Sequence, residues 1–274
     1  MTDPGPHNGP EPSAADSRSL AVRVHGSGRR IVLVHGFTQS KSSWHVIVDQ
    51  LGKLYEVVAI DLPDHADSGE VHASSLEEAA DLVGRAGGRA SYVGYSLGGR
   101  VCLTLALNRP ELIESLVLVG ATPGILADAD RATRVAADNA LANRLDPSDA
   151  SSPALELEDF LTEWLAGPLF AHLTSEQANL ASRRGSTTAG LARSLRTTGT
   201  GTQVPSHDRL GELLMPVLLV AGANDARFSA IAREMAGAIG SGASTAFIDG
   251  AGHAAPFEQP RAFAELVANF LERH

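Results

Sequence analysis

The sequence Ser91-Tyr92-Val93-Gly94-Tyr95-Ser96-Leu97-Gly98-Gly99 decides the fold of this 274-residue chain. A short apolar run leads into a Gly-x-Ser-x-Gly pattern, and the residues after it have a helical pattern. Glycines beside the serine permit a strained, tight turn between a strand and a helix, because a Cβ would clash there. Such a turn is typical of a nucleophile elbow, which presents the serine hydroxyl at a sheet edge beside helix N-terminal amides.

Short apolar runs alternate with helical patterns on both sides of this turn. The expected strands cover residues 20–24, 31–34, 56–60, 90–93, 116–119, 216–220 and 244–248, and the expected helices cover residues 42–51, 76–85, 97–107, 230–239 and 261–271. Strands that alternate with helices build right-handed βαβ units. The sequence therefore predicts an α/β fold, the α/β-hydrolase fold, with a mostly parallel, doubly wound sheet formed by residues 19–120 and 215–274.

The alternation stops between residues 121 and 214, where no β-rich run occurs. Helical patterns cover residues 130–145, 157–166, 175–184 and 189–196. A helical insertion after one strand covers the carboxyl edge of the sheet, where open α/β sheets bind their ligands. We therefore expect a helical cap at residues 121–214. Residues 1–18 hold four prolines among Gly, Ser and Asp, and we expect them to form a disordered tail.

The charge balance argues against several classes of partner. The chain has 32 acidic and 22 basic residues, a formal net charge of −10 and one cysteine, Cys102. Nucleic acids and anionic lipids both need a basic face, so we expect neither nucleic-acid nor membrane binding. No apolar run reaches the roughly 18 residues of a membrane span, and no signal peptide is visible. We expect a cytoplasmic protein, and the sequence leaves monomer and homo-oligomer equally open.

A serine nucleophile needs a base, and the base needs an acid that orients it. Of the ten histidines, His253 stands in a Gly-rich loop directly after the last expected strand. Asp225 follows the strand before it, whereas residues 120–124 hold no carboxylate and Asp249 lies too close to His253. We therefore expect a triad of Ser96, His253 and Asp225, in the chain order Ser, Asp, His that is typical of α/β hydrolases.

The loop His35-Gly36-Phe37, after the second expected strand, completes the expected site. The amides of Phe37 and Leu97 are expected to form an oxyanion hole, which stabilises developing negative charge. We expect His35 to orient this loop rather than to act as a catalyst. No segment has metal-ligand spacing, a phosphate-binding loop or a dinucleotide fingerprint, so we expect neither a metal nor a cofactor.

Beyond the superfamily pattern, the chain resembles 2-succinyl-6-hydroxy-2,4-cyclohexadiene-1-carboxylate (SHCHC) synthase of menaquinone (vitamin K2) biosynthesis. The likeness runs from about Ile31 to the C-terminus. Part of it lies in the elbow, with Tyr95 before the serine and Arg100 after it. The more specific part lies in the expected cap: residues 121–124 followed by Arg131 and Arg134, Trp164 with residues 167–170, and residues 190–196 and 199–203.

The resemblance implies a lyase that eliminates pyruvate from 2-succinyl-5-enolpyruvyl-6-hydroxy-3-cyclohexene-1-carboxylate to give SHCHC. By that analogy Ser96, polarised by His253 and Asp225, removes the ring proton beside the succinyl ketone, and the enolate oxygen lies against the amides of Phe37 and Leu97. The substrate is a small tricarboxylate, which arginine forks would bind. The implied substrate-binding residues are Tyr95, Arg100, Arg134, Trp164 and one of Arg183 and Arg184.

The distribution of charge agrees with a carboxylate pocket. Residues 177–207 contain no Asp or Glu but four arginines, at positions 183, 184, 193 and 196. One loop departs from the family, which has glycine on both sides of His65 where this chain has Asp64 and Ala66. In addition, Gln39 stands where small residues are commoner. We expect these departures to affect the substrate or the rate within an intact scaffold.

Two other functions stay open. The first is a hydrolase that acts on small esters or on C–C bonds of diketones, for which the arginines would have no carboxylate to bind. The second is a binding protein with the α/β-hydrolase fold and no catalysis. The presence of Ser96, Asp225 and His253 together argues against the second, because such proteins usually lose a member of the triad.

Overall fold

The computed structural model describes residues 19–147 and 154–274, and the expected disordered tail, residues 1–18, lies outside them. Seven strands form one sheet in the order β1-β3-β2-β4-β5-β6-β7. Their bounds are Val22–His25 (β1), Arg30–Val34 (β2), Glu56–Ile60 (β3), Ala90–Tyr95 (β4), Ile113–Val119 (β5), Val217–Gly222 (β6) and Ala243–Ile248 (β7). Only β1 runs antiparallel to its neighbour, and the other pairs are parallel. The predicted α/β fold with a mostly parallel sheet is confirmed.

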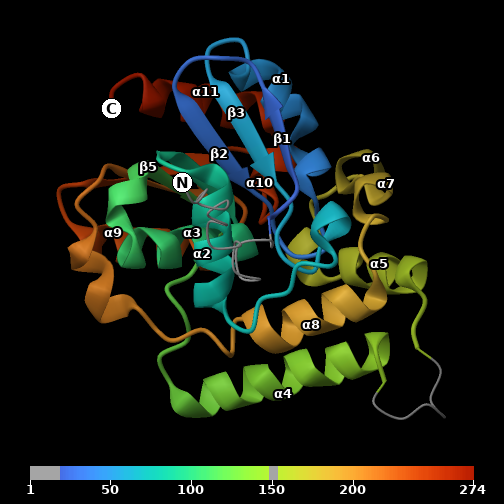
Figure 1. Ribbon diagram of the computed structural model, residues 1–274. Coiled ribbons are helices and arrows are strands. Elements are labelled where there is room, and N and C mark those ends of the chain that lie inside the picture. Colours follow the sequence, from blue (N-terminus) through green and yellow to red (C-terminus); the bar gives the residue numbers. More distant parts are fainter. Residues whose placement is uncertain (1–18, 148–153) are drawn as a thin grey trace, which may run out of the picture.

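Helices cover both faces of the sheet (Figure 1). Their bounds in the core are His45–Leu51 (α1), Leu76–Gly87 (α2), Leu97–Asn108 (α3), Ala226–Ile239 (α9), Ala255–Glu258 (α10) and Pro260–Leu271 (α11). Side chains alternate along β2 between two apolar clusters, one on each face of the sheet. Val32 belongs to the cluster that includes residues of α2, α3 and α9, and Leu33 belongs to the cluster that includes residues of α1 and α11. Helix α9 begins four residues before the expected start, because Asp225 caps it by accepting from the amide of Phe228.

The segment between β5 and β6 is helical, and α4 and α8 lie side by side along one end of the molecule (Figure 1). The helices are Asp128–Leu145 (α4), Leu157–Leu165 (α5), Ser175–Ala178 (α6), Leu180–Arg183 (α7) and Thr188–Thr198 (α8). They enclose an apolar cluster of their own, which includes Leu145, Phe160 and Leu191. The expected helix at residues 175–184 is broken into α6 and α7 at Asn179, whose φ of 43° is left-handed. The limits of the cap at residues 121 and 214 stay a prediction.

Short 3-10 helices complete the described chain at Lys41–Trp44 (η2), Ala66–Ser68 (η3), Pro110–Leu112 (η4), Pro168–Phe170 (η5) and His207–Glu212 (η6). Two of them, η2 and η3, follow β2 and β3 at the carboxyl edge of the sheet, on the side where the helices of the β5–β6 segment lie. Within residues 19–147 and 154–274, no helix combines the length and the apolar character needed to cross a membrane.

Candidate active site

Ser96 lies in a strained turn between β4 and α3. Its φ of 52° and ψ of −110° are unfavourable for a residue with a side chain. The turn also needs small neighbours, because a Cβ at Gly94 would lie 2.4 Å from the carbonyl oxygen of Gly98, and one at Gly98 would lie 2.2 Å from that of Val34. The first amides of α3, including that of Leu97, have no acceptor within the helix. This geometry is that of the predicted nucleophile elbow.

The structure brings Ser96, His253 and Asp225 together from three loops. His253 Nε2 lies 3.3 Å from Ser96 Oγ, and His253 Nδ1 lies 3.1 Å from Asp225 Oδ2. Burial opposes ionisation of Asp225, but hydrogen bonds from His253 and from the Phe228 amide outweigh it and hold the pKa of the Asp225 carboxyl below its ordinary value. An ionised Asp225 accepts from the His253 Nδ1–H, which leaves the Nε2 lone pair directed at the serine hydroxyl.

One cavity contains nearly all of the predicted site. Its lining includes Phe37, Tyr95, Ser96, Leu97, Arg100, Arg134, Trp164, Arg183 and His253. Phe37 lies on the loop after β2 and Leu97 at the start of α3, and both line the cavity with the serine. Asp225 lies behind the His253 ring rather than in the cavity lining. Among the described residues, no cluster of three His, Cys, Asp or Glu side chains is placed to hold a metal ion.

His35 is buried and holds the loop that carries Phe37. Its Nδ1 lies 2.8 Å from the carbonyl oxygen of Gly36, and its Nε2 accepts from the amide of Leu62 at 3.0 Å. Burial lowers the pKa of His35 well below its ordinary value, so the ring is neutral and donates from Nδ1. With both ring nitrogens bonded to backbone atoms, His35 links the loops after β2 and β3 and has no contact with Ser96.

Two arginines lie side by side at the cap end of the cavity. Arg100, on α3, is 7% exposed and donates from Nη2 to the carbonyl oxygen of Thr198 at 2.9 Å. Burial, together with the positive charge of Arg134, lowers the pKa of Arg100 to about 10, so Arg100 stays charged at neutral pH. Arg134, on α4, donates from Nε to Asp138 Oδ1 at 2.8 Å. Since Asp138 balances one of the two positive charges, the pair keeps one surplus positive charge beside the cavity.

The structure shows which of Arg183 and Arg184 faces the cavity, a choice that the sequence left open. Arg183 is 3% exposed, lines the cavity and donates to Thr38 Oγ1 at 2.5 Å and to the carbonyl oxygen of Ala178 at 2.9 Å. Arg184 points away from the cavity and pairs with Glu158 on the surface. Neighbouring residues of a helix diverge by about 100°, so only one of the two can face inward. Arg184 is therefore removed from the candidate site.

Most of the positive charge of residues 177–207 is neutralised, contrary to the expectation from the sequence. Three of the four arginines have carboxylate partners supplied by other segments: Glu158 pairs with Arg184, Asp64 with Arg193, and Asp146 with Arg196. Within the described parts of the chain, only Arg183 of these four has no carboxylate partner. The absence of acids from the segment was therefore a poor guide to unbalanced charge, because acids distant in sequence neutralise most of it.

Aromatic side chains form the remaining wall of the cavity. The ring of Trp164 lies 5.2 Å from that of Phe37 and 6.1 Å from that of Phe160, and its Nε1 is buried with no hydrogen-bond partner among the described residues. Trp164 therefore both lines the cavity and packs against the aromatic side chains beside it. Burial raises the pKa of the Tyr95 phenol, so Tyr95 is neutral.

Two residues of the site were not among the predicted ones. Phe228 lines the cavity and packs its ring 4.5 Å from that of His253, and Asp138 is the partner of Arg134. Gln39, a departure from the family pattern, accepts from the amide of Gly36 at 3.0 Å and lines the cavity. The spacing of Arg134 and Asp138, four residues apart on an expected helix, was the only signal in the sequence that could have found Asp138.

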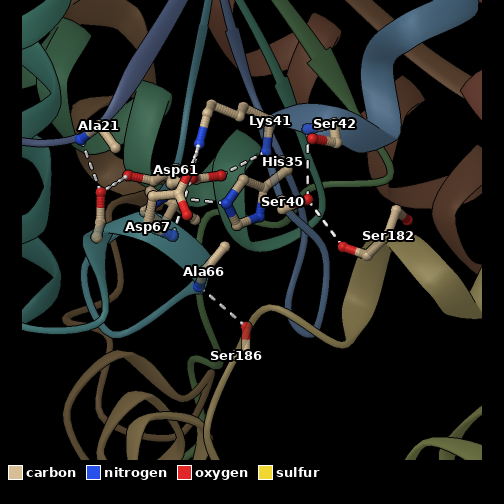
Figure 2. Close-up of polar contacts among 12 residues, drawn as sticks. Ala21, His35, Ser40, Lys41, Ser42, Asp61, Ala66, Asp67, Ser182 and Ser186 are labelled. Atoms are coloured by element: carbon tan, nitrogen blue, oxygen red, sulfur yellow. Dashed lines mark hydrogen bonds and ion pairs between the residues drawn. The ribbon is translucent and has the colours of Figure 1, made fainter.

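An ion cluster of the buried Lys41 and Asp61 and the exposed Asp67 joins the loops after β2 and β3 (Figure 2). Lys41 Nζ pairs with Asp61 and, at 2.6 Å, with Asp67 Oδ2, and the Lys41 amide donates to Asp61 Oδ1 at 2.6 Å. Asp61 is fully buried. Burial opposes the charge on Lys41, but the two carboxylates outweigh it and raise the pKa of Lys41 above its ordinary value. The cluster therefore fixes the loop that carries Phe37 to the loop that carries Asp64.

The same two loops hold the segment that carries Arg183 (Figure 2). Ser40 Oγ donates to the carbonyl oxygen of Ser182 at 2.9 Å, and the amide of Ala66 donates to Ser186 Oγ at 3.1 Å. Because the ion pair between Lys41 and Asp61 holds the two loops together, both loops can contact the segment that carries Arg183 at the same time.

Comparison with known proteins agrees with this geometry. Residues 31–266 match the model of the alpha/beta hydrolase family. The chain is 30% identical to the SHCHC synthase of Serratia proteamaculans over 264 residues, which cover 92% of this chain and 98% of that protein. It is 31% identical to the SHCHC synthase of Citrobacter koseri over 253 residues, which cover 88% of this chain and 93% of that protein.

Among solved structures, that of MenH from S. aureus superimposes with a TM-score of 0.81 at 28% identity and covers 92% of this chain and 98% of that one. The resemblance stated from the motifs of the elbow and the cap is thereby confirmed. With its parallel sheet, its serine elbow and relatives that match along most of its length, the chain belongs to the alpha/beta hydrolase family and is related to the SHCHC synthases within it.

Proposed function

We propose that this protein is an SHCHC synthase, a lyase that eliminates pyruvate from 2-succinyl-5-enolpyruvyl-6-hydroxy-3-cyclohexene-1-carboxylate in menaquinone biosynthesis. The observation that supports this most is the placement of Arg100, Arg134 and Arg183 in the one cavity that contains Ser96 and His253. A substrate with three carboxylates gives each guanidinium an anionic partner, whereas a neutral ester would leave the buried Arg100 and Arg183 without a carboxylate among the described residues.

The reaction begins with removal of a proton. Ser96 Oγ, polarised by His253, takes the proton from the ring carbon beside the succinyl ketone, and His253 accepts the serine proton at Nε2. The negative charge on the ketone oxygen is stabilised by the amides of Phe37 and Leu97. Asp225 stabilises the resulting imidazolium and keeps its orientation.

The enolate then expels the leaving group. A double bond forms at the deprotonated carbon, the ring double bond shifts by one position, and the C–O bond to the enolpyruvyl group breaks. The departing enolpyruvate takes up a proton and becomes pyruvate, while the ring becomes the cyclohexadiene of SHCHC. The enzyme supplies a base, an oxyanion hole and anchors for the carboxylates, and no acyl group is attached to Ser96 at any step.

The absence of an acyl-enzyme separates this proposal from the alternative of an ester or C–C hydrolase. We expect the intact mass of the protein to stay unchanged when substrate is mixed with enzyme and quenched within the first turnover. A hydrolase that attacks through Ser96 would show an added acyl mass during a burst. Detection of a succinyl-containing adduct on Ser96 would overturn the elimination mechanism.

Replacing Arg134 tests the anionic substrate. Arg134→Ala removes one charged hydrogen bond to a substrate carboxylate, and we expect kcat/KM to fall by roughly 10- to 150-fold, which corresponds to about 1.5–3 kcal/mol. The matched control is Arg184→Ala, because Arg184 lies outside the cavity and pairs with Glu158. Equal kcat/KM values for the Arg134 variant, the Arg184 variant and the unmodified enzyme would remove Arg134 from the substrate site.

A further inference from the structure

Asp64 adopts an uncommon conformation in the loop between β3 and α2. Its φ of 65° is left-handed, a region that few residues with a side chain adopt and that Asn and Asp adopt more readily than most. The carboxylate is nearly fully buried at 1% exposure. Its Oδ1 accepts from Arg193 Nε at 2.9 Å and lies 2.7 Å from His72 Nδ1. A buried carboxylate that is paired with two side chains, in a conformation that few residues adopt, indicates that the side chain itself has a purpose at this position.

The loop also touches the cap through its backbone. Gly190, on α8, lies so close that a Cβ there would come within 2.5 Å of the carbonyl oxygen of Asp64. Gly190 and Arg193 are three residues apart, so they share one face of α8. This face is therefore attached to the core at two points, by the close approach at Gly190 and by the ion pair from Arg193 to Asp64.

The other part of α8 shapes the candidate active site. Ser194, Leu195 and Thr198 line the cavity, and the carbonyl oxygen of Thr198 accepts from Arg100 Nη2 at 2.9 Å. Thr198 lies five residues beyond Arg193, about 7.5 Å along the helix axis. A shift or rotation of α8 would therefore move the acceptor that orients the Arg100 guanidinium. Asp64 itself is not part of the cavity lining.

We propose that Asp64 is a positioning residue for substrate binding: through Arg193 it holds α8 against the core, and α8 in turn sets the direction of Arg100. The inference rests on the proposed function, because it assumes that Arg100 binds a carboxylate of the substrate. In this role the Asp64 carboxylate anchors α8 to the loop between β3 and α2 through the ion pair with Arg193.

Two substitutions at Asp64 distinguish the effect of the carboxylate charge from the effect of the backbone conformation. Asp64→Asn keeps the size of the side chain and tolerates the left-handed conformation, but it removes the charge. Asp64→Gly removes the side chain and relieves the backbone, so the protein is expected to fold. We expect Asp64→Gly to raise KM by about tenfold, the effect of one charged hydrogen bond. Asp64→Asn should raise KM by less, and kcat should change by less than about twofold because the triad is untouched.

The matched control is Arg196→Gln. Arg196 is also an arginine of α8 with an aspartate partner, but that partner, Asp146, belongs to the segment just after α4 rather than to the core. We expect this variant to leave KM unchanged. Arg193→Gln should reproduce the effect of Asp64→Asn, and the double variant should be no worse than either single variant, since both remove the same interaction.

Amide hydrogen exchange provides a measurement that needs no substrate. Exchange in α8 should accelerate in Asp64→Asn and Asp64→Gly, while exchange in α11 stays as in the unmodified protein. Unchanged exchange in α8 would overturn the anchor. If the Asp64 variants showed faster exchange in α8 but a KM no higher than that of Arg196→Gln, the proposal that α8 orients Arg100 for substrate binding would be overturned. If the unmodified enzyme releases no pyruvate, the proposed function fails, whereas the exchange experiment still decides whether Asp64 anchors α8.

Discussion

Ser96→Ala is expected to abolish pyruvate release, with a fall in kcat of at least about 1,000-fold, the scale seen when a triad member is removed. Among the described residues, the Ser96 hydroxyl is the group that His253 Nε2 is placed to polarise, at 3.3 Å. Without it, the base that attacks the ring proton is lost, while the arginines and the oxyanion hole stay in place. KM should therefore change far less than kcat, which a stopped assay of pyruvate with each variant measures.

The control for this variant is Ser244→Ala, because Ser244 lies exposed on β7, away from the cavity. It should keep the activity of the unmodified enzyme. A Ser96→Ala variant with unchanged kcat would mean that another group removes the proton. His253 would then be the first candidate, since it lies in the same cavity and its Nε2 would face the substrate directly.

Lys41→Met is expected to lower the free energy of unfolding by about 3–5 kcal/mol, because it removes one partner of a buried ion pair and leaves a charge uncompensated. Asp61 is fully buried, and Lys41 Nζ is its charged partner (Figure 2). Methionine fills a similar volume, so the loss arises from the charge rather than from a cavity. Denaturant unfolding monitored by circular dichroism measures the effect.

The only other lysine of the chain, Lys53, gives a matched control. Lys53 is exposed, so Lys53→Met should change stability by less than about 0.5 kcal/mol. The pKa of Lys41 is raised, so its contribution is complete at neutral pH and is lost only as the pH rises through that raised value. The difference in the free energy of unfolding between the unmodified protein and Lys41→Met should therefore become smaller at strongly alkaline pH. An equal loss for both lysine variants would contradict the account of the cluster.

The parts of the structure that the sequence predicts depend on local patterns. The strands and core helices follow from apolar periodicity, and the elbow follows from glycines whose positions admit no Cβ. Asp225 and His253 could be proposed because parallel strands deliver the residues that follow them to one edge of the sheet. Those three features depend on neighbouring residues or on strand ends, so a single sequence contains enough information for them.

The parts that the sequence does not predict depend on contacts between distant segments. To choose between Arg183 and Arg184, one must know which way each residue of α7 points. That direction depends on the break in the helix at Asn179, whose conformation is left-handed. To predict the charge of the segment between β5 and β6, one must know that Arg193 pairs with Asp64, which is 129 positions away in the sequence. The sequence marked Asp64 as a departure from the family, but only the structure shows that its carboxylate faces α8 rather than the cavity.

The proposed function requires that the Ser96 site eliminates pyruvate rather than hydrolysing an ester. The most direct measurement follows pyruvate release from freshly prepared 2-succinyl-5-enolpyruvyl-6-hydroxy-3-cyclohexene-1-carboxylate with a coupled dehydrogenase, in parallel with cleavage of a nitrophenyl ester. The account predicts pyruvate release well above the spontaneous background, lost in Ser96→Ala, with slow ester cleavage. Brisk ester cleavage with no pyruvate above background would contradict it.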